Sequence, residues 1–168
     1  FYSILAKEAF YYKKDKPEYE LIRPYLPKPL RLLEVGCGAG YFVDKLQGEL
    51  ELYQGLEFSP DAVKEARSKG LVVSSEPIES FAQSHPEKFN AVGSFQVLEH
   101  VADIHSIIQA SLECLENNGV FFFAVPNQES FVGQAPDEIL NLPPHHMTRW
   151  HRSTLETLGD FFPLDLIA

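Results

Sequence analysis

Residues 32–42 have the sequence LLEVGCGAGYF, in which an apolar run contains one acidic residue and leads directly into three glycines at alternate positions. Glycine lacks a side chain and tolerates positive φ, so a turn of this kind lets the backbone pass close to a ligand. A dinucleotide-binding fingerprint, G-x-G-x-x-G, would place its third glycine at position 41, which is Tyr41 here. The stretch therefore predicts a strand followed by a ligand-binding turn with a spacing, G-x-G-x-G, that differs from the dinucleotide pattern.

The acidic residue in this stretch, Glu34, lies in a strand that is otherwise apolar from Leu32 to Val35. Burying a carboxylate without a partner costs on the order of several kcal/mol. We therefore expect Glu34 to face a cationic ligand or to accept hydrogen bonds from the adjoining loop.

Strand-like and helical segments alternate along the rest of the chain. Strands are predicted at residues 30–35, 50–58, 71–74, 89–95 and 120–125, and helices at 39–46, 60–69, 78–84 and 104–116. Ser59 and Asp103 precede two of the helices as N-caps, and Asn117-Asn118-Gly119 is expected to end the last one. Strands that are apolar on both faces and alternate with helices indicate a doubly wound α/β fold with a mostly parallel sheet. Ligands of such folds bind beyond the carboxyl ends of the strands, where the strand order reverses.

Composition narrows the class of protein further. The 168 residues carry 14 basic and 24 acidic side chains, a formal charge of −10, and 45% are hydrophobic, which fits one globular domain and excludes disorder and coiled coil. The longest clearly apolar run, Val120–Val125, is far shorter than the roughly 20 residues needed to span a bilayer, so no membrane partner is expected. The acidic charge also argues against nucleic acid as a partner. Cys37 and Cys114 are expected to be reduced thiols, which favours a cytoplasmic setting.

Residues 34–40 resemble the first motif of the class I S-adenosylmethionine-dependent methyltransferases, and they match it position by position. A second acid, Glu57, ends the second predicted strand, where a carboxylate can accept hydrogen bonds from both ribose hydroxyls. The same acid would serve NAD, so Glu34 and the glycine spacing are the features that favour S-adenosylmethionine as the cofactor.

Three further segments continue the resemblance, which covers roughly residues 16 to 160. FNAV at 89–92 and QVLEHV at 96–101 are similar to the fourth-strand motif, with Asn90 in place of the usual Asp, a change that affects one expected hydrogen bond. Residues 115–125 are similar to the fifth-strand motif. NLPPHHMTRW at 141–150 is similar to a P-P-H-H segment found in one bacterial subgroup of these enzymes.

The resemblance implies a Rossmann-like methyltransferase fold with strand order 3-2-1-4-5-7-6. The chain begins at Phe1 rather than Met and stops within the expected strand six, 162–167, so we expect a fragment truncated before strand seven. It is expected to form a single domain with an N-terminal helical segment at 1–28, a cofactor-binding core at 29–126, and a lid, a helix and the start of strand six at 127–168.

The implied cofactor residues follow the first four strands. Ribose is assigned to Glu57, adenine to the region of Glu76 and Ile78, and the methionine end to Ser94, Phe95 and Gln96. The full set is Glu34, Gly36, Cys37, Gly38, Gly40, Glu57, Phe58, Glu76, Ile78, Ser94, Phe95 and Gln96.

Three histidines, His100, His145 and His146, are the candidate catalytic residues, because an imidazole with a pKa near neutrality can take a proton from the methyl acceptor. The alternative is structural: His100 would pack against a loop, and His145 with His146 would fix loop geometry. Some relatives, notably ubiquinone-biosynthesis O-methyltransferases, bind a divalent metal with acids and a His in this region. Gln96 stands where a carboxylate ligand would be needed, so no metal site is expected.

The sequence therefore predicts methyl transfer from S-adenosylmethionine to a small-molecule acceptor by in-line displacement, in which positioning of the two reactants supplies most of the catalysis. Two alternatives remain open. One is a domain that binds S-adenosylmethionine without catalysis or has lost it. The other, an NAD-dependent oxidoreductase, is disfavoured by Tyr41. The oligomeric state and the acceptor atom do not follow from the sequence.

Overall fold

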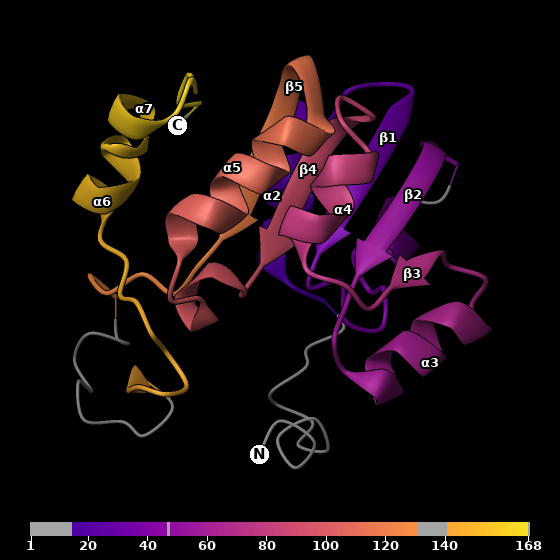
Figure 1. Ribbon diagram of the computed structural model, residues 1–168, viewed down its shortest axis with the longest axis horizontal. Coiled ribbons are helices and arrows are strands. Elements are labelled where there is room, and N and C mark those ends of the chain that lie inside the picture. The colour runs from indigo at the N-terminus through magenta and orange to yellow at the C-terminus, as the bar shows by residue number, and fades with distance from the viewer. Residues whose placement is uncertain (1–14, 47, 131–140, 168) are drawn as a thin grey trace.

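A computed structural model describes residues 15–46, 48–130 and 141–167, and its centre is a five-stranded parallel sheet (Figure 1). The strands are β1 (Leu30–Val35), β2 (Leu50–Leu56), β3 (Val73–Ser74), β4 (Phe89–Phe95) and β5 (Leu115–Ala124). Their order is β3-β2-β1-β4-β5, so the order reverses between β1 and β4. This arrangement confirms the doubly wound α/β fold and places the expected ligand edge at the carboxyl ends of β1 and β4.

Helices cover both faces of the sheet. They are α2 (Pro17–Ile22), α3 (Pro60–Ser68), α4 (Ile78–Ser84), α5 (Ile104–Cys114), α6 (Arg152–Glu156) and α7 (Leu158–Phe161), with the 3-10 turns η1 (Arg23–Tyr25), η2 (Val43–Leu46) and η3 (Leu98–His100). In Figure 1, α4 and α5 lie side by side in front of the sheet, α2 lies behind it, and α6 and α7 stand beyond the β5 edge. Within the described ranges, none of these helices is long and apolar enough to cross a bilayer.

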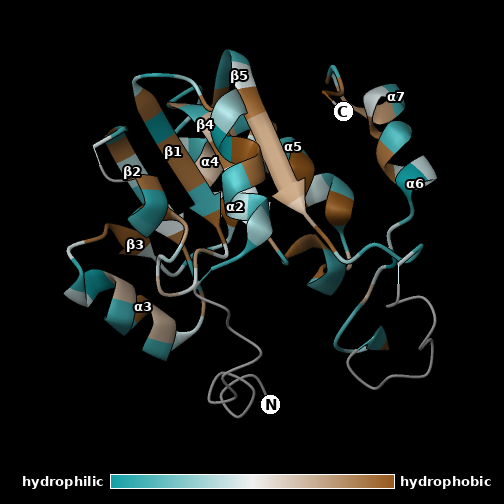
Figure 2. Ribbon diagram, turned by 180° about the vertical axis from the view of Figure 1, so that it is seen from behind, coloured by the Kyte–Doolittle hydropathy of each residue, from teal (hydrophilic) through white to brown (hydrophobic). Residues whose placement is uncertain are grey.

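The core has two halves, one on each face of the sheet. On the α2 side, Tyr19 and Phe42 each place their ring centroid 4.8 Å from that of Phe95. On the α4 and α5 side, Leu33 and Phe81 belong to a second buried cluster. Figure 2 shows the corresponding hydrophobic colouring along β1 and the arrow end of β5. Neighbouring residues of β1 thus point into opposite halves, which explains why the strand is apolar at nearly every position.

The predicted helix at 39–46 is wrong in extent, because only the 3-10 turn η2 forms there. Gly40 has φ +77°, a left-handed conformation that cannot continue a right-handed helix, and its N–H donates to the carbonyl of Cys37 in a separate turn. Helical structure therefore begins only at Val43, after the glycine-rich turn.

The boundary between α5 and β5 also differs from the prediction. The helix was expected to reach Glu116 and to exit through Asn118, but α5 ends at Cys114 and β5 starts at Leu115. The N–H groups of Glu87 and Lys88 donate to the carbonyls of the last two helical residues over 2.9 and 3.0 Å. These hydrogen bonds end the helix and start strand pairing earlier than predicted. Asn118 does adopt a positive φ of +62°, but it does so inside the strand.

The expected sixth strand at 162–167 is wrong for the described chain. Residues after α7 form bends without strand pairing, and the Phe162 ring instead packs 5.1 Å from that of His105. Among the described residues β5 is the edge strand of the sheet, and the 162–167 segment pairs with no strand. The three-part division of the chain stays a prediction, and parts of its first and last segments, 1–14 and 131–140, lie outside the described residues.

Candidate functional site

The turn after β1 is closed on one side and open on the other. Gly36 has φ +69°, and a Cβ built there would lie 2.4 Å from Cγ2 of Val97, so only glycine fits against the loop that follows β4. Gly38 has φ +54°, but a Cβ there would meet nothing within 4 Å. The backbone at Gly38 is therefore the part of the turn that a ligand can approach closely.

Glu34 lies behind this turn and is only 3% exposed. The Tyr53 hydroxyl, from the neighbouring strand β2, donates to its Oε2 over 2.9 Å. Burial raises the pKa of Glu34 to about 8, although the Tyr53 hydrogen bond and the positive charge of Lys16 oppose the rise. The hydrogen-bond donor that we expected from the loop thus comes from β2. Even with this hydrogen bond, the Glu34 carboxyl group retains its proton near neutral pH. A cationic ligand would favour its ionised form.

Glu57 ties the first two loops together. Its Oε2 accepts from the Gly38 N–H over 2.9 Å and its Oε1 accepts from the Ser59 N–H over 2.7 Å. A carboxylate has about four lone-pair sites, so two acceptor positions remain for other donors. Glu57 holds the open part of the turn and is at the same time placed to meet a ligand there.

The predicted adenine and methionine residues occupy different surroundings. Glu76 is partly exposed just after β3, whereas the Ile78 side chain is 2% exposed and packs in the cluster beneath α4 and α5. Phe58 is 68% exposed. Phe58 and Glu76 lie on the loops after β2 and β3 and Ile78 begins α4, and the roles of all three toward a cofactor stay predictions.

The end of β4 turns sharply. Ser94 is buried at 4% exposure, and Phe95 packs into the aromatic cluster below the sheet. Gln96 follows with φ +59° and donates its N–H to the Ala124 carbonyl over 2.8 Å. A left-handed non-glycine residue carries strain of about 1–3 kcal/mol and is found preferentially at ligand sites. The turn directs the chain across the carboxyl edge of β1.

Asn90 has a structural role that an aspartate could not fill. Its Oδ1 accepts from the Arg31 N–H and its Nδ2 donates to the Pro29 carbonyl, both over 2.8 Å. A carboxylate has no donor for Pro29 at neutral pH, so the amide clamps the start of β1 with two hydrogen bonds.

The three candidate histidines, predicted separately, lie together. Glu99 accepts at its backbone carbonyl from the N–H groups of Met147 and Thr148, at 2.7 and 3.2 Å, which fixes the 145–148 segment against η3. The ring centroids of His100, His145 and His146 are consequently 4.6 to 5.0 Å apart. We call these three side chains the histidine cluster.

The histidine cluster is neutral at pH 7. Burial lowers the pKa of His100 and of His145, and burial together with the neighbouring histidines and Arg149 lowers that of His146 to about 4. A neutral imidazole keeps one nitrogen lone pair, which can accept a proton or bind a metal.

Glu99 is a site residue that the sequence analysis did not single out. It is 1% exposed, and among the described residues its Oε2 has no hydrogen-bond partner. Burial raises its pKa to about 7, and Oε1 lies 3.9 Å from Nε2 of His100. The positive charge of Lys16 acts electrostatically on both Glu99 and Glu34. The LEHV motif was the available signal, but it did not reveal the burial.

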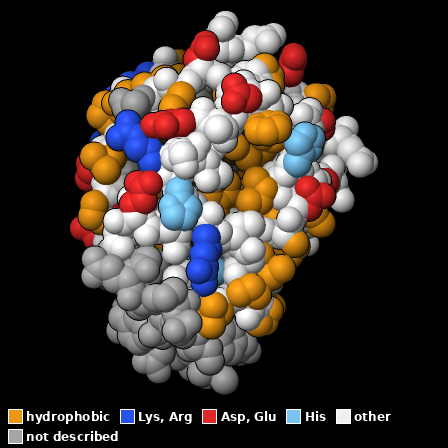
Figure 3. Space-filling view, turned by 90° about the vertical axis from the view of Figure 1, so that its left-hand side faces the viewer, with side chains coloured by type: hydrophobic (Ala, Val, Ile, Leu, Met, Phe, Trp, Pro, Cys, Tyr) orange, Lys and Arg blue, Asp and Glu red, His pale blue; other side chains and the backbone are white. Residues whose placement is uncertain are grey.

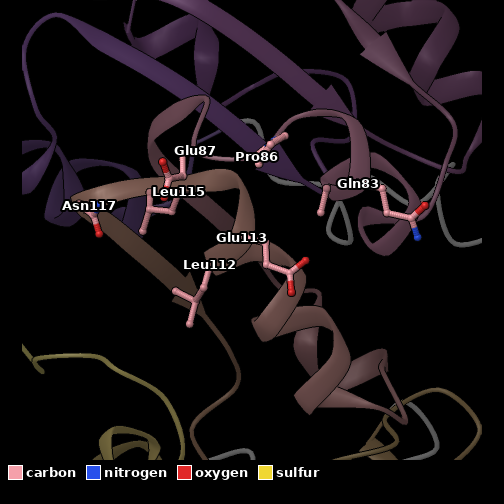
Figure 4. A pocket seen from close by; sticks show the side chains of 8 residues that line it. Gln83, Pro86, Glu87, Leu112, Glu113, Leu115 and Asn117 are labelled. Atoms are coloured by element: carbon pink, nitrogen blue, oxygen red, sulfur yellow. The ribbon is translucent and has the colours of Figure 1, made fainter.

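Two surface hollows lie apart from the glycine turn. One of about 500 Å³ is lined by Gln83, Pro86, Glu87, Leu112, Glu113 and Asn117 (Figure 4). It is formed where β4 and β5 begin, at the opposite end of the strands from the glycine turn, so it is not assigned to the cofactor. Another, of about 540 Å³, lies between the end of β5 and α6 and includes Trp150. Figure 3 looks onto the end of the molecule that carries α6 and α7, where hydrophobic side chains gather near the middle.

Comparison with known proteins agrees with this geometry. A parallel sheet in this order, with an acid–glycine turn after β1 and an acid after β2, defines the Rossmann-like class of S-adenosylmethionine-dependent methyltransferases. The chain belongs to the methyltransferase domain family, whose model matches residues 5–166. S-adenosylmethionine is accordingly its cofactor.

Individual relatives are distant. Ubiquinone biosynthesis O-methyltransferases from Yersinia enterocolitica and Pectobacterium carotovorum are each 30% identical over 106 residues, which is 60% of this chain and 44% of theirs. The chain thus spans less than half the length of these curated relatives. A methyltransferase structure from Archaeoglobus fulgidus superimposes with a TM-score of 0.75 and 20% identity, covering 96% of this chain and 73% of that one. A methyltransferase structure from Thermotoga maritima superimposes with a TM-score of 0.71 and 21% identity, covering 86% of this chain and 67% of that one.

Proposed function

We propose that this domain transfers the methyl group of S-adenosylmethionine to a small-molecule acceptor. The observation that carries the proposal is the turn after β1, where the open backbone at Gly38 donates its N–H to the Glu57 carboxylate and the buried Glu34 ends the preceding strand. This arrangement suits a cofactor with a cationic methionine end, which favours the ionised form of Glu34, and a ribose with two hydroxyl donors, from which Glu57 can accept hydrogen bonds.

We propose roles for the residues around the turn as follows. Glu34 faces the cationic methionine end, Glu57 accepts from ribose, and Glu76 approaches adenine. Ser94 and Gln96 line the methionine end. The remaining proposed contacts are Gly36, Cys37, Gly38, Gly40, Phe58, Ile78 and Phe95.

Methyl transfer from a sulfonium is an in-line displacement in which the acceptor attacks the methyl carbon while the thioether leaves. Most of the rate enhancement comes from holding donor and acceptor in line, so few side chains need take part chemically. His100 follows β4 and holds the histidine cluster next to the proposed methionine end of the cofactor, and we assign the cluster to the acceptor side of the reaction.

The acceptor class is supported by charge and by the relatives. The formal charge of −10 disfavours a polyanionic acceptor such as nucleic acid. The curated relatives are named for O-methylation in ubiquinone biosynthesis, which concerns a small molecule. Both observations favour a small-molecule acceptor.

Calorimetric titration tests the cofactor assignment directly. S-adenosylmethionine and S-adenosylhomocysteine should bind with micromolar affinity, NADH should not bind, and Glu57→Ala should weaken binding about tenfold. Because Glu57 also holds the Gly38 and Ser59 N–H groups, Glu57→Gln serves as a second variant that keeps one acceptor oxygen. Thermal unfolding checks that each variant is folded. Failure of the folded wild-type chain to bind either sulfur compound would overturn the proposal.

A further inference from the structure

The histidine cluster brings three metal-binding side chains together from two separate segments. One candidate ligand atom from each of His100, His145 and His146 lies within 4.8 Å of the other two. His145 is buried and the other two are partly buried, so the cluster is not a chance group of solvated side chains. The segments are locked to each other through the backbone carbonyl of Glu99.

Hydrogen bonds fix the tautomer of His100. Its Nδ1 lies 2.6 Å from the backbone carbonyl oxygen of His145, and a carbonyl oxygen can only accept. Nδ1 therefore carries the proton, and the lone pair of this neutral ring is on Nε2.

The same reasoning fixes His146. Its Nδ1 lies 3.2 Å from Oδ1 of Asn141, and the Gln128 side-chain amide donates to that same oxygen over 3.3 Å. Since the oxygen accepts from Gln128, Nδ1 of His146 is the second donor, and the ring lone pair is again on Nε2. An imidazole whose Nδ1–H is held by a carbonyl or amide oxygen, with Nε2 turned elsewhere, is the usual arrangement of metal-binding histidines.

We propose that His100, His145 and His146 form a binding site for a divalent transition metal ion, with the Glu99 carboxylate beside it. Oε1 of Glu99 lies 3.9 Å from Nε2 of His100, and among the described residues Oε2 of Glu99 has no hydrogen-bond partner. Three nitrogens on a tetrahedral ion at 2.0–2.1 Å lie about 3.4 Å apart. Candidate nitrogens within 4.8 Å of one another must therefore approach by up to about 1.4 Å on binding.

The donor set selects the type of metal. Imidazole nitrogens suit Zn²⁺, Co²⁺ and Ni²⁺, whereas Mg²⁺ and Ca²⁺ prefer oxygen ligands. The sequence analysis expected no metal because Gln96 replaces a carboxylate, but that reasoning considered only the loop after β4. Here two ligands come from the 141–150 segment, which gives a nitrogen-rich site in place of an acid-rich one.

A metal at this place would serve the proposed reaction as a Lewis acid that binds an acceptor oxygen and lowers the pKa of its hydroxyl group. That role rests on the proposed function. Metal binding itself does not, because it needs neither cofactor nor acceptor, and it can be measured without either.

Cobalt titration of the metal-stripped chain tests the site. Co²⁺ alone should bind at one equivalent and produce the intense visible absorption of a tetrahedral complex, and Zn²⁺ but not Mg²⁺ should abolish that absorption. His146→Gln should weaken Co²⁺ binding at least tenfold. His151→Ala is the matched control, because His151 is an exposed histidine of the same region and lies outside the cluster.

Each outcome decides the matter. No tetrahedral spectrum from the folded wild-type chain, or equal binding by wild type and His146→Gln, would overturn the proposal. If His146→Gln unfolds, His145→Ala replaces it, with circular dichroism as the folding check. Co²⁺ binding by a chain that fails to bind S-adenosylmethionine would support the metal site while refuting the proposed function.

Discussion

The hydroxyl of Tyr53 donates to Oε2 of Glu34 over 2.9 Å, across the pairing of β2 with β1. This hydrogen bond lowers the pKa of Glu34 and so opposes the effect of burial, which raises it. The side chain of a neighbouring strand thus helps to keep an acidic group inside an apolar sheet, next to the turn that is proposed to hold the cofactor.

Tyr53→Phe should therefore destabilise the fold and weaken cofactor binding. Removing one partner of a buried polar group costs about 1–3 kcal/mol, and the pKa of Glu34 should rise further. Urea unfolding measures the first effect and calorimetric titration the second. Tyr25→Phe is the control, because Tyr25 is 48% exposed, and it should change neither quantity. Equal stability of Tyr53→Phe and wild type would show that this hydrogen bond is unimportant.

Glu34 should also make the stability of the cofactor-free chain depend on pH. Its pKa is about 8 in the folded state against an ordinary value of 4.5, so the folded chain holds this proton more tightly. The stabilisation is complete below pH 4.5 and is lost as pH rises toward 8, by on the order of 5 kcal/mol. Unfolding free energies measured across this range should fall less steeply for Glu34→Gln. Parallel curves for the two proteins would contradict the assignment.

Cofactor binding should release the proton of Glu34. At pH 7 the carboxyl group is largely protonated, and the cationic methionine end favours the ionised form. Calorimetry in two buffers of different ionisation enthalpy counts the protons released. Wild type should release more than Glu34→Gln, and the difference isolates Glu34 from any proton lost by the cofactor itself. If the two counts agree, Glu34 does not face the cationic end.

Replacement of both His145 and His146 by Ala should lower turnover about a hundredfold while leaving the affinity for S-adenosylmethionine nearly unchanged, because both side chains are assigned to the acceptor side. Initial rates with an identified acceptor, set beside calorimetric affinities, provide the comparison. His151→Ala controls for loss of an imidazole in the same region. Unchanged turnover in the double variant would remove both histidines from the mechanism.

The features that the sequence predicted well are those encoded by local pattern. The apolar run of β1 and the glycines after it follow directly from periodicity and from the need for positive φ. Asp103 caps α5 as expected, accepting from the Ser106 N–H over 3.0 Å. Such features depend on neighbours within a few residues, so they can be predicted without knowledge of the fold.

The features that the sequence missed depend on contacts between distant segments. The end of α5 is set by Glu87 and Lys88, each of which lies 26 residues before the helical residue whose carbonyl it contacts. The histidine cluster requires the carbonyl of Glu99 to accept from Met147 and Thr148, 48 and 49 residues later. Periodicity carries no information about such pairings, and it likewise gave no sign that the Glu99 carboxyl is buried.

Two glycines allow the role of the turn backbone to be separated from the role of its conformation. Gly38 and Gly48 both have positive φ, at +54° and +84°, and a Cβ at either would meet nothing within 4 Å. Alanine at each position should therefore cost a similar 1–2 kcal/mol of conformational strain. Gly48 lies ten residues after Gly38 and precedes the start of β2, at the end of the parallel sheet opposite the turn that holds the Gly38 N–H.

Only Gly38→Ala should impair cofactor binding. Its new methyl group would occupy the open side of the turn, where the ligand is proposed to approach, and we expect at least a tenfold loss of affinity for S-adenosylhomocysteine. Gly48→Ala should bind as wild type does, despite a comparable fall in unfolding free energy. The pair is measured by urea unfolding and calorimetric titration under the same conditions. If both variants lose affinity equally, the effect is one of stability, and the open backbone at Gly38 is not where the cofactor binds.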